Sequence, residues 1–155
     1  MVPAPRILLV PVDGSRGSTA AAELAAQLAG SLRLPVRLLF VFPESPMDIF
    51  GLPVESGPRE ELQYFSPERF TELRNRSAEK AFRIIREALG SVDVKIEEKI
   101  LLGEPASAII RHAEGETNPM IIMGRRGHGS VRELLVGSVS QRVMHHATCP
   151  VTVVR

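Results

Sequence analysis

Two apolar runs lie near the start of the chain, at Ile7–Val12 (ILLVPV) and Val36–Phe42 (VRLLFVF). Such nearly continuous runs are typical of strands that are buried on both faces, as in a parallel sheet. Between them, apolar side chains recur at helical spacing, and we expect a helix that is capped by Ser18 and stopped by Pro35. The pattern therefore predicts a strand, a helix and a second buried strand.

The alternation of helix and strand resumes further along the chain. Apolar positions from Phe70 to Ala88 predict a long helix that is ended by Gly90. Polar and apolar residues then alternate over residues 92–97, which predicts a half-exposed strand at an edge of the sheet. The sequence Gly103-Glu104-Pro105 predicts the start of a third helix, because proline is favoured in the first turn.

The last third of the chain completes the pattern. We expect a buried strand at Met120–Met123, a helix at Ser138–Ala147 and a final strand at Val151–Val154. Five strands that alternate with four helices predict an α/β fold with a parallel sheet covered on both faces. At 155 residues, the chain is expected to form a single domain over residues 1–155.

Residues 43–67 depart from this pattern. They contain five prolines, two glycines and an excess of acidic residues. Too few apolar residues occur there to form a core, so we expect a long irregular loop between the second strand and the second long helix. Two interpretations remain open for this loop: a lid or partner surface, and an ordinary surface loop.

Charge and composition narrow the function classes. The net charge of +1 argues against bulk nucleic-acid binding, although residues 124–155 carry five arginines against one acid, as an anion site would. Arginine outnumbers lysine sixteen to three along the whole chain, so a single arginine is weak evidence for phosphate binding.

The sequence also gives an expectation for where in the cell the protein is found. No apolar run approaches the roughly 18 residues of a membrane span, and residues 1–6 lack the charge order of a signal peptide. The single cysteine, Cys149, excludes an internal disulfide. We expect a cytoplasmic protein without membrane or nucleic-acid partners.

The strongest chemical signal is a glycine-rich segment after the fourth strand. It runs from Gly124 to Ser130 (GRRGHGS) and, six residues later, reaches Gly137-Ser138. Glycines let backbone N–H groups approach a phosphate, and a helix N-terminus is a natural anion site. Ser138 and Gln141 also fit a capping box. A mobile surface loop with incidental glycines is the alternative.

Two familiar phosphate-binding loops do not match. A Walker loop needs Lys followed by Ser or Thr after its last glycine, whereas Ser130-Val131 follows Gly129. The dinucleotide fingerprint needs a glycine where Arg132 stands, and it belongs after the first strand. We therefore reject both.

The spacing Gly124-x2-Gly127-x9-Gly137-Ser138 matches the G-2x-G-9x-G-(S/T) motif, so the chain resembles the ATP-binding universal stress proteins. The resemblance extends over nearly the whole chain and includes the opening ILLVPVDGS, the Gly103-Glu104-Pro105 turn and the closing CPVTVV. It implies a five-stranded parallel sheet in the order 3-2-1-4-5, a Rossmann-like site for ATP, with Mg²⁺ as its companion ion, and a homodimer formed through strand 151–154.

The resemblance also implies a role for particular residues. Asp13 would bond the ribose, the backbone of Val41 would read the adenine edge, and the glycines would lie along the ribose and phosphates. Gly137 and the helix start would hold the outer phosphates. The expected contact residues are Pro11, Val12, Asp13, Val41, Gly124, Arg125, Arg126, Gly127, His128, Gly129, Ser130, Gly137, Ser138 and Val139.

Three function classes follow. The first is a dimeric, ATP-binding regulatory protein of the stress response. The second is a slow ATPase or adenylyl-transferring enzyme, although no general base and no HxGH or SGG loop is present, so we expect at most weak hydrolysis. The third is a nucleotide-free interaction module.

His145-His146 could ligate a metal, but favourable placement at a helix C-terminus is the simpler interpretation.

Overall fold

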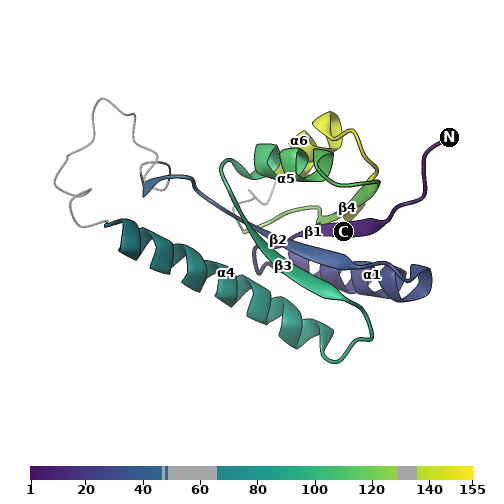
Figure 1. The fold of residues 1–155 in the computed structure, drawn as a ribbon, viewed down its shortest axis with the longest axis horizontal. Coiled ribbons are helices and arrows are strands. Elements are labelled where there is room, and N and C mark those ends of the chain that lie inside the picture. Colours follow the sequence, from purple (N-terminus) through teal and green to yellow (C-terminus); the bar gives the residue numbers. More distant parts are fainter. Residues whose placement is uncertain (47, 49–65, 129–135) are drawn as a thin grey trace.

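The computed structural model describes residues 1–46, 48, 66–128 and 136–155. In this part of the chain, five strands form one parallel sheet in the order β3-β2-β1-β4-β5, which confirms the predicted fold (Figure 1). The elements in chain order are β1 (Ile7–Pro11), α1 (Arg16–Leu32), β2 (Val36–Phe42), α4 (Pro67–Leu89), β3 (Ile96–Leu102), α5 (Pro105–Glu114), β4 (Pro119–Gly124), α6 (Ser138–His146) and β5 (Val151–Val154).

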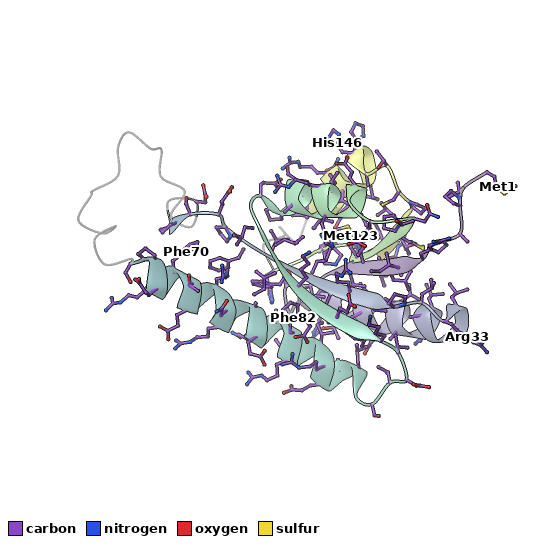
Figure 2. The ribbon with its side chains drawn as sticks, in the orientation of Figure 1. Met1, Arg33, Phe70, Phe82, Met123 and His146 are labelled. Atoms are coloured by element: carbon purple, nitrogen blue, oxygen red, sulfur yellow. The ribbon has the colours of Figure 1, made fainter. Side chains whose placement is uncertain are left out.

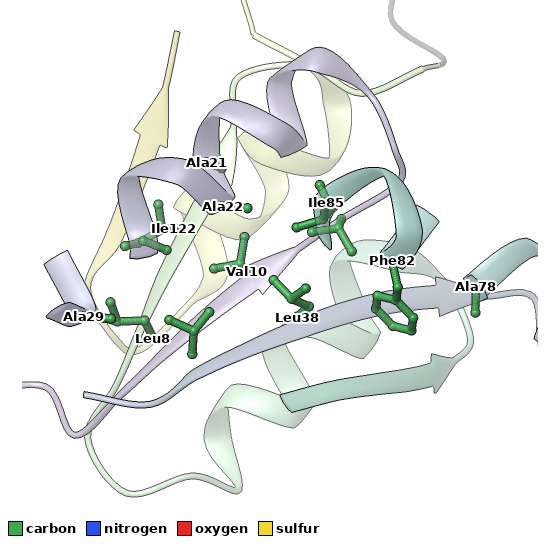
Figure 3. Close-up of a cluster of buried hydrophobic side chains, with 13 residues drawn as sticks. Leu8, Val10, Ala21, Ala22, Ala29, Leu38, Ala78, Phe82, Ile85 and Ile122 are labelled. Carbon is green, nitrogen blue, oxygen red and sulfur yellow. The ribbon is translucent and has the colours of Figure 1, made fainter. Parts of the chain in front are cut away.

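Helices cover both faces of the sheet. Figure 1 shows α1 and α4 on one face and α5 and α6 on the other. Leu8, Val10 and Leu38 point toward α1 and α4, where Ile85 joins the same buried cluster (Figure 3). The intervening residue Leu9 belongs instead to the cluster under α5 and α6. Alternate strand residues thus supply two cores, which is why the strands read as continuous apolar runs.

Aromatic side chains attach α4 to β2. The ring of Phe82 lies 6.2 Å from that of Phe40, edge to face, and Phe70 lies 5.4 Å from Phe42 (Figure 2). Burying an aromatic side chain of this kind stabilises a fold by about 1.5–3 kcal/mol. The long helix is therefore held along the second strand at both ends of its apolar face.

Pro11 lies in the central strand at a position where its missing N–H costs little. Leu8 and Val12 donate their N–H groups to carbonyls of Pro35 and Leu39 on the β2 side, at 3.0 and 2.8 Å. The nitrogen of Pro11 therefore points to the β4 side, where the pairing of β1 with β4 already ends at Leu9. A proline is tolerated where no ladder bond is lost.

The N-caps of two helices differ from the prediction. Ser15 rather than Ser18 caps α1, and its Oγ accepts the N–H of Ser18 at 3.2 Å. Helix α6 begins at Ser138, with Gly137 as the N-cap, so the predicted capping box of Ser138 with Gln141 is wrong. A serine in the first turn of a helix does not have the extended backbone that a capping residue needs. The helix ends at His146, one residue earlier than expected.

The strand and helix limits around α4 and β3 also differ. The third strand spans Ile96–Leu102, not residues 92–97, because it pairs residue by residue with β2 from Val36 to Phe42. Its place at the edge of the sheet is confirmed. Helix α4 begins at Pro67, which had been expected to end the loop. Most of that loop, residues 47 and 49–65, lies outside the described residues. The first strand ends at Pro11 rather than Val12.

Candidate functional site

A cavity of about 420 Å³ opens at the carboxyl ends of β1, β2 and β4. The strand order reverses between β1 and β4, and open α/β sheets bind their ligands at this switch point. Eleven of the expected contact residues line the cavity: Pro11, Val12, Asp13, Val41, Gly124, Arg126, Gly127, His128, Gly137, Ser138 and Val139. Residues from four separate segments of the chain thus meet in one place.

Of the other three expected residues, the structure describes only one, Arg125, which does not line the cavity. Arg125 lies beside the cavity, where its N–H donates to the carbonyl of Val154 at 2.8 Å. Gly129 and Ser130 lie outside the described residues. The structural role of Arg125 is to join the loop to the last strand.

The cavity has an apolar side and a polar side. Leu39, Phe40 and Ile109 contribute apolar surface, and Ser15, Ser18 and Ser140 contribute hydroxyl groups. These residues, together with Pro105 and Met123, were missing from the predicted site. Helical spacing alone could not have identified Ile109, because the packing of α5 beside β2 brings it to the cavity.

The two ends of the glycine-rich loop are fastened together. The N–H of Gly137 donates to the carbonyl of Arg125 at 2.8 Å. The buried hydroxyl of Ser140 donates to the carbonyl of Gly124, also at 2.8 Å. Because α6 holds both ends, the loop leaves the sheet and returns at fixed positions.

Asp13 connects the turn after β1 with the loop. Its Oδ1 accepts the N–H of Ser15 at 2.9 Å, and its Oδ2 accepts the N–H of His128 at 3.0 Å. Burial by itself raises the pKa of Asp13, but the hydrogen bonds from Ser15 and His128 lower the pKa more, to below its ordinary value. The carboxylate is therefore ionised at neutral pH, and both of its oxygens are already engaged by backbone N–H groups.

Close backbone approaches explain two of the loop glycines. A Cβ on Gly127 would lie 2.4 Å from Oδ2 of Asp13, and a Cβ on Gly137 would lie 3.3 Å from the carbonyl oxygen of Arg125. The φ of Gly137 is −69°, an angle that any residue can adopt. Glycine is needed there because neighbouring backbone is close, not because of the backbone angle.

The start of α6 faces the cavity. Gly137 is its N-cap, and within the described chain no side chain caps it. The first N–H groups of a helix have no partner inside the helix, and they carry the positive end of its dipole. Ser138 and Val139, the first two helical residues, line the cavity, so this end of the site favours a negatively charged group.

Other candidate chemistry does not gather into a site. Among the described residues, no three His, Cys, Asp or Glu side chains are placed to hold a metal ion. His145 and His146 pack their rings edge to face, 4.8 Å apart, in the last turn of α6. Burial raises the pKa of the Cys149 thiol, which keeps it protonated. None of the helices in the described ranges is long and apolar enough to cross a membrane.

The sheet order and the cavity at its switch point define a Rossmann-like α/β protein. Residues 5–155 match the Universal stress protein family, and the chain belongs to that family. A universal stress protein of Thermus aquaticus is 36% identical over 155 residues, which cover 97% of this chain and 98% of the relative.

Solved structures share the fold. The universal stress protein UspA from Lactobacillus plantarum superposes with a TM-score of 0.75 at 25% identity, over 99% of this chain and 100% of that one. A universal stress protein in complex with cAMP has a TM-score of 0.62 at 22% identity, over 99% of each chain. One from Archaeoglobus fulgidus in complex with dAMP has a TM-score of 0.57 at 22% identity, over the full length of both.

Proposed function

We propose that this protein is an ATP-binding universal stress protein that holds the nucleotide in the cavity between β1 and β4. The observation that carries the proposal is that one cavity combines apolar side chains with a glycine-rich loop and a helix N-terminus. An adenine ring needs the first and a phosphate chain needs the second. The cavity volume of 420 Å³ lies within the range of small-molecule sites.

The nucleoside would occupy the β1–β2 side. Pro11 and Val12 would pack beside it, the backbone of Val41 would meet the adenine edge, and Asp13 would contact the ribose. Since two backbone N–H groups already use the Asp13 carboxylate, a ribose hydroxyl would share it with His128 or replace that bond. The structures of relatives with cAMP and dAMP support an adenine nucleotide as the ligand class.

The phosphates would extend toward the loop and α6. Gly124 and Gly127 would lie along the ribose and the first phosphate, and the amides of Ser138 and Val139 would meet the outer phosphates. Gly129 and Ser130 belong to the same proposed set. Arg126 and His128 line the cavity and would add positive charge, whereas Arg125 would act through the backbone.

Mg²⁺ would enter with the nucleotide. Among the described lining residues, Asp13 alone carries a carboxylate, and backbone N–H groups occupy it. Magnesium keeps several waters and binds readily to phosphate oxygens, so the nucleotide and water would supply most of its ligands. The residues present therefore fit Mg²⁺ held chiefly by ATP, with the Ser138 hydroxyl as a nearby oxygen.

We propose that two copies of the chain pair through β5. This strand lies at an edge of the sheet, where its outer N–H and C=O groups face away from β4. Its four residues are only partly buried in the single chain. Two β5 strands related by a twofold axis would add to each other in antiparallel fashion.

The proposed role is regulatory: a single domain, residues 1–155, whose occupancy by ATP signals or protects under stress. A slow ATPase or an adenylyl-transferring enzyme is the second candidate, and a nucleotide-free interaction module is the third. A cytoplasmic location stays a prediction that cell fractionation would test.

Mass spectrometry of the freshly purified, denatured protein separates these candidates. Co-purified ATP supports the regulatory binding protein. ADP or AMP alone, with release of phosphate from added ATP, favours the enzyme. If no nucleotide is carried and added ATP–Mg²⁺ does not bind, the proposal is wrong and the interaction module remains.

A further inference from the structure

Gly17, in the first turn of α1, lies in direct backbone contact with the start of the glycine-rich loop. A Cβ on Gly17 would lie 2.4 Å from the carbonyl oxygen of Arg126 and 3.6 Å from the Cα of Gly124. Conversely, a Cβ on Gly124 would lie 2.6 Å from the carbonyl oxygen of Gly17. Ordinary van der Waals contact begins at 3.4 Å, so a side chain at either position would force the two segments apart by about 1 Å.

Hydrogen bonds to α6 oppose such a displacement of the loop. On its other side, the buried Ser140 hydroxyl holds the carbonyl of Gly124, and the N–H of Gly137 holds the carbonyl of Arg125. Residues 124–126 are thus held between the first turn of α1 and the first turn of α6. A displacement by α1 would pass directly into the next residues, Gly127 and His128.

Those next residues form the phosphate side of the cavity. The N–H of His128 bonds Asp13 at 3.0 Å, and Gly127 lies against the same carboxylate. We infer that Gly17 is a positioning residue: its missing side chain lets the loop lie close enough to α1 for the phosphate side of the site to form. This inference rests on the proposed binding of ATP.

The part of the cavity proposed for the adenine ring is built from other segments. Pro11, Val41 and Ile109 come from β1, β2 and α5, and Gly17 does not line the cavity itself. A side chain at Gly17 should therefore weaken ligands with a phosphate chain more than ligands without one. The inference thus makes Gly17 a determinant of the preference for ATP over adenosine.

The same helix supplies a matched control. Gly30 also lies in α1, where a Cβ would meet only one atom of Val94, at 3.9 Å. Gly30→Ala makes the same chemical change without moving the loop, and it should stabilise the helix because alanine is the better helix former.

Titration calorimetry with ATP–Mg²⁺ and with adenosine gives the test on the parent, Gly17→Ala and Gly30→Ala. We expect Gly17→Ala to weaken ATP binding by about tenfold or more, because a displacement near 1 Å breaks short hydrogen bonds. Adenosine binding should fall by less than ATP binding, because the contacts of its adenine ring are kept. Gly30→Ala should match the parent for both ligands. Equal losses for ATP and adenosine in Gly17→Ala, or no loss for either, would overturn the inference.

Amide hydrogen exchange in the nucleotide-free proteins tests the same contact without a ligand. We expect faster exchange at His128 and Gly137 in Gly17→Ala, with exchange at the core residue Leu9 unchanged relative to Gly30→Ala. Unchanged exchange at His128 and Gly137 would overturn the positioning role even if ATP bound tightly. If the parent binds no ATP, the proposed function fails, and these exchange rates still decide whether Gly17 positions the loop.

Folding is a separate requirement. If Gly17→Ala does not fold, the double variant Gly17→Ala/Gly30→Ala takes its place, because the second change adds helix stability. The same exchange rates are then compared with those of Gly30→Ala alone, with the same two outcomes.

Discussion

Gly137 lies where the glycine-rich loop meets the start of α6, the part of the proposed site that would hold the outer phosphates. We expect Gly137→Val to weaken ATP binding by at least about a hundredfold, because its side chain would crowd the Cα of Arg126, 3.4 Å from the Cβ, and displace the start of α6, where Ser138 and Val139 line the cavity. The Cβ would also crowd the Arg125 carbonyl, 3.3 Å away. Titration calorimetry measures the affinity, and thermal unfolding without nucleotide should show a loss of only about 1 kcal/mol.

Ser138→Ala is the milder companion to that change. The hydroxyl would lose one hydrogen bond to phosphate, about 1 kcal/mol, or roughly fivefold in affinity. Because Gly137 rather than Ser138 is the N-cap, stability should stay close to that of the parent. If Gly137→Val bound ATP as tightly as the parent, the proposed phosphate position would be wrong.

Asp13 joins the nucleoside side of the cavity to the loop, and its replacement tests that link. In Asp13→Asn, the amide oxygen can accept only one of the two N–H groups, of Ser15 and His128, that the carboxylate accepts. The amide nitrogen replaces the other oxygen and cannot accept a hydrogen bond. A hydrogen bond to a charged group contributes about 1.5–3 kcal/mol, so ATP affinity should fall by about tenfold or more. Exposed Asp93, at the opposite end of the sheet, gives the control Asp93→Asn, which should bind as the parent does. Equal affinities for all three proteins would contradict the link.

At the residue scale, the glycine motif and the family resemblance that it supports predicted most of the residues that line the cavity, but not why each glycine is there. Gly127 and Gly137 were expected from the motif, and both line the cavity. Gly17 and Ser140 were missed, because each acts through backbone groups that lie far away in the sequence. A local pattern cannot reveal which backbone another segment will approach.

At the scale of elements, the exposed edge strand β5 gives a prediction about assembly. Val153→Asp would place a charge in the proposed pairing of two β5 strands, and we expect light scattering at micromolar concentration to change from dimer to monomer. Val92→Asp, on an exposed residue before β3, is the matched control and should leave the dimer intact. A parent protein that is monomeric at this concentration would refute the proposed dimer.

Element types were predicted better than element ends. The second and fifth strands match their predicted bounds, since buried apolar runs end where the pairing ends. The caps of α1 and α6 and the first residue of β3 were wrong, because several serines and one alternating stretch fit the local rules equally well. Pairing with β2 decides where β3 begins, and the pairing depends on the whole sheet.

At the scale of the whole molecule, two carboxylates make stability depend on acid. Burial raises the pKa of Glu104, but hydrogen bonds from Ser107 and Ala106 hold it below its ordinary value, and Asp13 is lowered in the same way. A folded-state pKa below the unfolded one contributes stability above about pH 4, which is lost as the pH falls through the folded value. Thermal unfolding between pH 7 and pH 2 should therefore show falling stability below about pH 4.

Two variants show how much of this loss of stability in acid comes from Asp13. Asp13→Asn should have a shallower decline in acid than Asp93→Asn, because it removes the carboxylate of Asp13, whose pKa is lowered by folding. Identical declines for the two variants would show that Asp13 is not held ionised by its two backbone partners.

The central claim is that one ATP binds at the switch point of the sheet, against the glycine-rich loop and the start of α6. Titration of the nucleotide-free protein with ATP–Mg²⁺ in a calorimeter tests it most directly, with Gly137→Val measured beside the parent. The account predicts saturable binding of one ATP per chain to the parent and none to Gly137→Val at the same concentrations. No binding to the parent, or equal binding to both proteins, would contradict it.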